Sequence, residues 1–161
     1  MQNAKDSFYM ALRTRLATIN PQRSVLVRGA VRPGILVEEA EAPFGQAPAD
    51  VFILRWTGLA MDTDLCSPLA AIECEISYQT CGTQAFGGLD RGRAITQLDG
   101  ELTAILNPYC TQKWNYATTP PSIMLTQVFW DEPAIAPITS QRDRLSRSAK
   151  VMVYSYQEQG E

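Results

Sequence analysis

Apolar and polar residues alternate along residues 70–79, which is the clearest pattern in the chain. The apolar set is Ile72, Cys74, Ile76 and Tyr78, and the polar set is Glu73, Glu75, Ser77 and Gln79. Successive side chains of a strand point to opposite faces of the sheet. The pattern therefore predicts a strand with one face in a core and the other toward solvent or a partner.

The spacing changes to three and four residues after a glycine-rich stretch at 82–88. The apolar positions are now Ile95, Leu98, Leu102 and Ile105, widened by Leu106. This spacing predicts an amphipathic helix over 90–106, capped by Asp90 and ended by Asn107-Pro108. A strand that leads into such a helix is typical of α+β packing.

A second helix is expected at the N-terminus, over residues 4–19, with Asn3 as its cap and Pro21 beyond its end. Residues 24–31 and 35–37 are expected to form a hairpin through a turn at Pro33-Gly34. Residues 50–57 are apolar almost throughout, which favours a central strand covered on both faces. Strands are also expected over 123–130 and 149–156.

Loops are expected over 38–48, 58–68, 107–122 and 137–146. The predicted fold class is therefore α+β. It has a single mixed or antiparallel sheet of about five to six strands, with the N-terminal helix and the second helix packed on it. No linker or repeat divides the chain, so residues 1–161 are expected to form one domain.

Composition and charge exclude several classes of function. The net charge of −3 and pI near 5.0 argue against a nucleic-acid binder, which has a basic face. Residues 1–16 lack the apolar core of a signal peptide, and no stretch is apolar enough to predict a membrane span. We therefore expect a cytoplasmic protein whose four cysteines stay reduced.

The residues for common catalytic sites are missing or badly spaced. The chain has no histidine, which removes the usual general base and most transition-metal sites. Two carboxylate pairs, Asp62 with Asp64 and Glu73 with Glu75, could in principle act together, but solvated acidic residues explain them better. No catalytic, cofactor or metal site is predicted, since the cysteine and glycine spacings match no zinc or phosphate motif.

The best candidates for function are surface residues in the expected loops. Trp56 and Trp130 are expected in the core, whereas Trp114, Tyr116 and Phe44 are candidate anchors for a partner. An acidic cluster (Glu38, Glu39, Glu41) and a basic cluster (Arg142, Arg144, Arg147) accompany them. Solvated loops would explain both clusters. The sharper hypothesis is that the acidic cluster of one subunit meets the basic cluster of the next in a head-to-tail ring.

Several of these features together resemble a known family. These features are the opening helix ended at Asn20-Pro21; the strand Val51 to Trp56; Ile72-Glu73-Cys74-Glu75-Ile76-Ser77-Tyr78; Gly87-Gly88-Leu89-Asp90-Arg91-Gly92-Arg93; Leu98-Asp99-Gly100-Glu101-Leu102; and Val128-Phe129-Trp130 in the first of two C-terminal strands. In length and element order the chain resembles the lambda-like tail terminator (tail completion) proteins of long-tailed bacteriophages, prophages and phage-tail-like particles.

The resemblance implies a structural subunit without catalysis or cofactor. Such subunits form a hexameric ring that caps the tail tube, ends its polymerisation and presents a surface for the head. The implied partners are other copies of the chain, the tail tube protein and head–tail connector proteins, with no nucleic-acid specificity and no membrane. The implied location is the cytoplasm of the bacterial host and then the virion. The loops 38–48 and 107–122 match nothing in that family, so no contact residue is carried over.

One alternative function remains open on the sequence alone. A small α+β module could bind a small molecule in a sheet curved around the 90–106 helix, with the tryptophans lining the pocket. Ring formation would favour the tail protein, and a melting temperature that rises with a ligand would favour the binding module.

Overall fold

The computed structural model describes residues 1–41, 47–64 and 67–158. Two helices and ten strands occur in these residues, with a short 3₁₀ turn before the second helix. The elements are α1 (Gln2–Ile19), β1 (Ser24–Val27), β2 (Ala30–Pro33), β3 (Ile35–Val37), β4 (Phe52–Asp62), β5 (Leu69–Thr80), η1 (Gln84–Phe86), α2 (Arg91–Leu106), β6 (Tyr109–Asn115), β7 (Ser122–Trp130), β8 (Ala134–Ile135), β9 (Thr139–Gln141) and β10 (Arg144–Tyr156).

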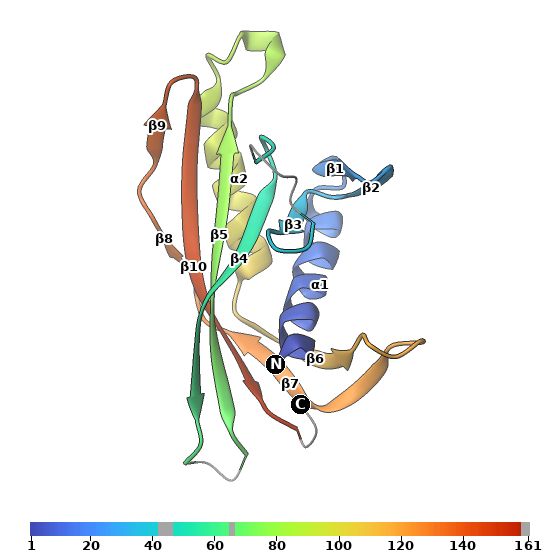
Figure 1. The fold of residues 1–161 in the computed structure, drawn as a ribbon. Coiled ribbons are helices and arrows are strands. Elements are labelled where there is room, and N and C mark those ends of the chain that lie inside the picture. Colours follow the sequence, from blue (N-terminus) through green and yellow to red (C-terminus); the bar gives the residue numbers. More distant parts are fainter. Residues whose placement is uncertain (42–46, 65–66, 159–161) are drawn as a thin grey trace.

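A large curled sheet forms the body of the molecule (Figure 1). In the described residues it has eight strands in the order β3-β4-β5-β10-β7-β6, with β8 and β9 also pairing with β10. β3 runs parallel to β4, and the other pairs are antiparallel. The α+β class is therefore confirmed, but the predicted five to six strands are too few.

The larger of two buried apolar clusters in the described residues lies on one face of this sheet, where both helices pack. Ile72, Cys74 and Ile76 of β5 are buried there, as the alternation predicts. α1 contributes Phe8, whose ring meets those of Trp130 and Trp56 at centroid distances of 5.1 and 5.9 Å. Trp130 is buried and Trp56 is half-buried against this core, so the expected packing role of both tryptophans is confirmed.

The first hairpin is displaced from its predicted position. Its turn lies at Arg28-Gly29, where φ is +49° and +81°, rather than at Pro33-Gly34. Two positive φ values match the turn twist that two-residue hairpins favour. β1 therefore pairs with β2 in a separate two-stranded sheet, and β3 joins the main sheet beside β4.

We expect Arg28→Asn to stabilise the protein. Asparagine tolerates a left-handed backbone better than arginine does, and Asn-Gly is the preferred pair for this turn. Arg28 is exposed, so the change should raise the free energy of unfolding by up to about 1 kcal/mol. Thermal unfolding of both proteins measures it. A lower melting temperature would mean that the arginine side chain contributes a contact that outweighs the backbone preference.

Three predicted loops contain strands. β6 lies in 107–122, β9 and the start of β10 lie in 137–146, and β4 continues through residue 62. The strand expected at 50–57 to be central and covered on both faces differs from that expectation: within β4 only Phe52, Ile53 and Leu54 are buried, and these are also the residues of β4 that pair with β3. Beyond these residues, Leu59 and Met61 are exposed.

The predicted N-cap of α1 is wrong, whereas α2 begins after Asp90 and ends before Asn107 as predicted. Asn3 lies inside α1, which begins at Gln2. Asp90 precedes α2 but makes no side-chain capping bond. Its carboxylate instead accepts hydrogen bonds from the Thr83 N–H at 2.9 Å and the Thr83 hydroxyl at 2.7 Å, which closes the 83–90 loop.

Candidate functional site

The acidic cluster divides into an outer and an inner part. Glu38 and Glu39 follow β3 directly and are exposed. The Glu38 N–H donates to the Leu54 carbonyl at 2.8 Å, which holds this segment along β4. The Glu38 carboxylate lies 3.8 Å from the Arg55 guanidinium, in a solvated pair that contributes little to stability. Both carboxylates therefore remain accessible to a partner.

Glu41 is used inside the chain. Its carboxylate accepts hydrogen bonds from the Tyr9 hydroxyl and the Arg32 guanidinium, which ties α1 to β2. Burial and then the hydrogen bond to Glu41 raise the pKa of the Tyr9 hydroxyl above its usual range. Phe44, the apolar anchor predicted in the same loop, lies outside the described residues.

The basic cluster divides in the same way, and Arg147 is its inner part. The Arg147 guanidinium donates to the Asp99 carboxylate of α2, and its Nε donates to the Ala136 carbonyl at 2.7 Å. Asp99 also accepts the Tyr78 hydroxyl at 2.5 Å. Burial and then this bond raise the pKa of the Tyr78 hydroxyl above its usual range. Arg147 therefore fastens α2 to β5 and β10.

Arg142 and Arg144 form the outer part, at the turn between β9 and β10. Arg142 is exposed and has a φ of +54°, and Arg144 is 26 % exposed with its Nε 3.9 Å from the Asp143 carboxylate. The start of α2 adds two arginines: Arg91, which donates to the Arg142 carbonyl at 3.5 Å, and exposed Arg93. We call Arg91, Arg93, Arg142 and Arg144 the basic end.

The two outer groups lie at opposite edges of the sheet. In the half of the sheet that contains β3, the strand order is β3-β4-β5-β10, with β8 and β9 on the far side of β10. Glu38 and Glu39 follow the edge strand β3, whereas Arg142 follows the edge strand β9. Figure 1 shows β3 and β9 on either side of the long strands. The two clusters cannot neutralise each other within one subunit across three intervening strands.

The predicted aromatic anchors are placed differently from expectation. Trp114 belongs to β6 rather than to a loop, and its backbone N–H donates to the Ser7 hydroxyl of α1 at 2.9 Å. Trp114 and Tyr116 are half-buried in a groove of about 430 Å³ between α1 and β6, together with Met10 and Ala11. Burial and the nearby Asp6 carboxylate raise the pKa of Tyr116. The exposed part of each of these two aromatic side chains is accessible to a partner.

Sequence reasoning missed the most exposed apolar side chains, which lie on projecting turns and hairpins. They are Leu125 (94 % exposed), Leu89 (93 %), Val31 (73 %), Leu26 (69 %), Ile123 (65 %) and Phe86 (60 %). Leu89 and Phe86 stand next to the basic end, on the loop that Asp90 closes. Leu125 lies within the apolar run predicted as a strand over 123–130, so its exposure could not be read from the pattern, and Leu89 belongs to no periodic pattern.

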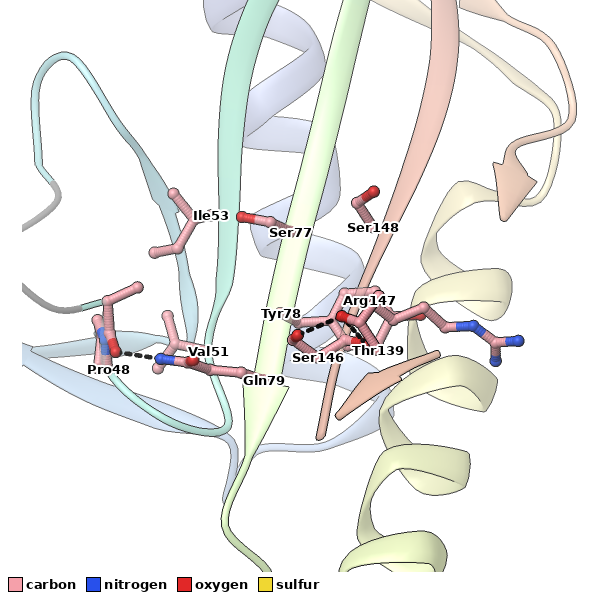
Figure 2. A pocket seen from close by; sticks show the side chains of 11 residues that line it. Pro48, Val51, Ile53, Ser77, Tyr78, Gln79, Thr139, Ser146, Arg147 and Ser148 are labelled. Atoms are coloured by element: carbon pink, nitrogen blue, oxygen red, sulfur yellow. Dashed lines mark hydrogen bonds between the residues drawn. The ribbon is translucent and has the colours of Figure 1, made fainter. Parts of the chain in front are cut away.

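A small cavity opens on the sheet face opposite the helices (Figure 2). Its volume is about 250 Å³, with Val51 and Ile53 on one side and several hydroxyls on the other. The hydroxyl side consists of Ser77, Thr139, Ser146 and Ser148. The Thr139 and Ser146 hydroxyls bond each other at 2.7 Å. No tryptophan is among the lining residues, unlike the aromatic pocket considered from the sequence.

The candidate carboxylate pairs take part in ion pairs or turns. On the open sheet face, Glu75 pairs with Arg55 and Glu73 pairs with Lys150, each at 3.0 Å. Hydrogen bonds from Thr57 and Lys150 lower the pKa of the Glu73 carboxyl. Asp62 accepts the Asp64 N–H at 3.0 Å near the β4–β5 turn. Within residues 1–41, 47–64 and 67–158 no three ligand-type side chains converge as a metal site.

No model of a protein family matches the chain, and no curated protein matches it either. In the described residues, neither helix is long and apolar enough to cross a membrane.

Proposed function

We propose that this chain is a structural assembly subunit of a phage or phage-like tail, a tail terminator that acts as a ring. The ring would cap the tail tube, end its polymerisation and present the surface to which the head is joined. Its partners would be further copies of the chain, the tail tube protein and head–tail connector proteins. It would form in the cytoplasm of the bacterial host and end in the virion or tail-like particle.

The observation that carries the proposal is the separation of charge across the sheet. Exposed carboxylates at Glu38 and Glu39 lie at the β3 edge, and the exposed Arg142 and the partly exposed Arg144 lie at the β9 edge. Two complementary surfaces at different places on one subunit generate head-to-tail contacts, which close into a ring when the rotation is right. The mixed α+β fold agrees with the family that the sequence resembles.

The apolar surface gives a second line of support. Monomeric soluble proteins expose scattered apolar side chains, but clusters on projecting elements are typical of interaction sites. Here the exposed apolar residues include Leu26 and Val31 on the β1–β2 hairpin and Phe86 and Leu89 beside the basic end. An assembly subunit has a use for such anchors at positions away from its core.

The mass of the protein in solution tests the proposal. We expect light scattering after size-exclusion chromatography, from micromolar concentrations upward, to show a species near six times the 17.8 kDa of one chain. Raising the salt concentration should shift the equilibrium toward the single chain, because exposed charges are screened. The mass of a single chain at every protein concentration, at low salt as well as at high salt, would contradict the proposal.

A binding module for a small molecule is the second candidate, and the cavity beside Ile53 is the observation in its favour. Its apolar wall and opposed hydroxyls are the elements of small ligand sites, although its volume lies just below their usual range of roughly 300–1,000 Å³. A single-chain mass together with a melting temperature that rises with an added small polar ligand would favour this function.

A further inference from the structure

We propose that the bulge in β7 is a carboxylate-binding site, whose resident ligand is Glu158 of the chain's own C-terminal segment and which can take a carboxylate from outside when Glu158 is absent. The proposal concerns residues far from the acidic and basic edges. It is therefore independent of the ring.

The site begins with a break in the pairing of β6 with β7. Gln112 pairs with Gln127 and Trp114 with Ile123, so one residue of β6 faces three residues of β7. Two carbonyls of the bulge accept hydrogen bonds from the β6 side, where the Gln112 side-chain amide donates to the Met124 carbonyl at 2.6 Å and to the Thr126 carbonyl at 3.3 Å. The N–H groups of Leu125 and Thr126 point the other way, toward the segment that follows β10.

The N–H groups and one hydroxyl converge on the Glu158 carboxylate. Leu125 N–H donates to Oε2 at 3.1 Å, and Thr126 N–H donates to Oε1 at 2.8 Å. The Thr126 hydroxyl donates to the same Oε1 at 2.7 Å. β10 itself pairs with β7 only as far as Ser155 and Val128, so the side chain of Glu158 replaces the strand that would otherwise satisfy these groups.

A buried ammonium completes the site. Lys113, the single β6 residue opposite the bulge, has no exposed surface, and its Nζ lies 3.8 Å from Glu158 Oε1. It also donates to the Tyr156 carbonyl at 2.8 Å and the Ser155 hydroxyl at 3.2 Å. A buried cation is costly without a counter-charge, so this geometry requires an anion. Burial raises the pKa of Glu158, but the bonds from Thr126 and Leu125 and the Lys113 charge hold it below its usual range.

The ligand that fits this arrangement is a carboxylate. Two backbone N–H groups and a hydroxyl are directional donors to two oxygens in one plane, and the ammonium supplies the charge. The site also fixes a surface feature, because Leu125, 94 % exposed, stands at the centre of the bulge. Filling the site therefore keeps this apolar side chain turned outward.

Chemical rescue tests the proposal. We expect Glu158→Ala to lower the melting temperature by roughly 5 °C, since it removes hydrogen bonds to a charged group. Acetate at tens of millimolar should restore most of that loss. It should also return the Leu125 and Thr126 amide proton shifts toward their wild-type positions in ¹H–¹⁵N spectra. Acetamide and sodium chloride at matched concentration should not.

The controls separate a specific site from a general salt effect. Glu132→Ala removes an exposed carboxylate elsewhere and should show no response to acetate. Adding Thr126→Val or Lys113→Met to Glu158→Ala should abolish the rescue, and the threonine variant serves if the lysine variant does not fold. Equal effects of acetate, acetamide and chloride, or unchanged Leu125 and Thr126 shifts in acetate, would overturn the proposal.

Discussion

Glu101→Ala is expected to destabilise the protein by about 3–5 kcal/mol, the cost of leaving a buried charge without its partner. Glu101 lies on α2 and is 7 % exposed, and its carboxylate is held at both oxygens by Arg23, itself 11 % exposed. Asn20 and Gln97 donate to the same carboxylate at 2.7 and 3.0 Å. The cluster joins α2 to the segment between α1 and β1, so its loss affects three elements. Equilibrium unfolding in urea measures the change.

Two comparisons show whether burial is the cause. Glu75→Ala breaks a solvated pair with Arg55 on the open sheet face and should change stability by less than about 1 kcal/mol. The double variant Arg23→Met with Glu101→Leu removes both charges together and should be more stable than Glu101→Ala alone. If Glu75→Ala and Glu101→Ala lowered the free energy of unfolding by the same amount, burial of the Arg23–Glu101 pair would not be the cause of its contribution to stability.

The same carboxylate gives an acid dependence with a defined sign. Burial raises the pKa of Glu101, but the hydrogen bonds from Arg23 and Asn20 outweigh it and the net pKa is lowered. The unfolded chain then binds a proton more readily than the folded one. The stabilisation from Glu101 is therefore complete above its unfolded pKa of about 4.3 and is lost as the pH falls through the lower folded value. Glu101→Gln should flatten this part of the stability curve.

The spacing of apolar residues predicted those helices and strands that bury one regular apolar face. The alternation around Ile76 gave β5 and the stripe through Leu98 gave α2, because each pattern has a single buried face. β6 was missed because its buried and exposed residues do not alternate, and Lys113 is the residue of this strand that is buried. The strand is instead held against α1 by the hydrogen bond from the Trp114 backbone N–H to the Ser7 hydroxyl. Composition cannot indicate that a lysine is in the interior.

The candidate interface was predictable in part. Charge alone located Glu38 and Arg142 as members of opposed clusters, and both are exposed. It could not separate them from Glu41 and Arg147, whose partners Arg32 and Asp99 come from other elements. The sequence likewise contains no sign that β3 and β9 are opposite edges, which depends on the strand order.

Reversing one outer cluster is expected to weaken self-assembly, and reversing both to restore it. Glu38→Lys with Glu39→Lys would place like charges against Arg142 and Arg144 of the next subunit, and such contacts cost several kcal/mol at an interface. The dissociation constant should rise by roughly a hundredfold. Glu41 and Arg147 are left unchanged, because their ion pairs hold the fold. Light scattering over a concentration series gives the constant.

Arg142→Asn provides the matched control for folding, since asparagine suits the φ of +54° at that turn and removes only the charge. It should weaken assembly less than Arg142→Glu with Arg144→Glu, without lowering the melting temperature of the single chain. Adding the arginine reversals to the glutamate reversals exchanges the signs at both edges and should recover the ring. Because complementary charge is all that the exchange preserves, recovery identifies the two edges as partners. Failure to recover, with each parent variant folded, would mean that the acidic and basic edges do not meet.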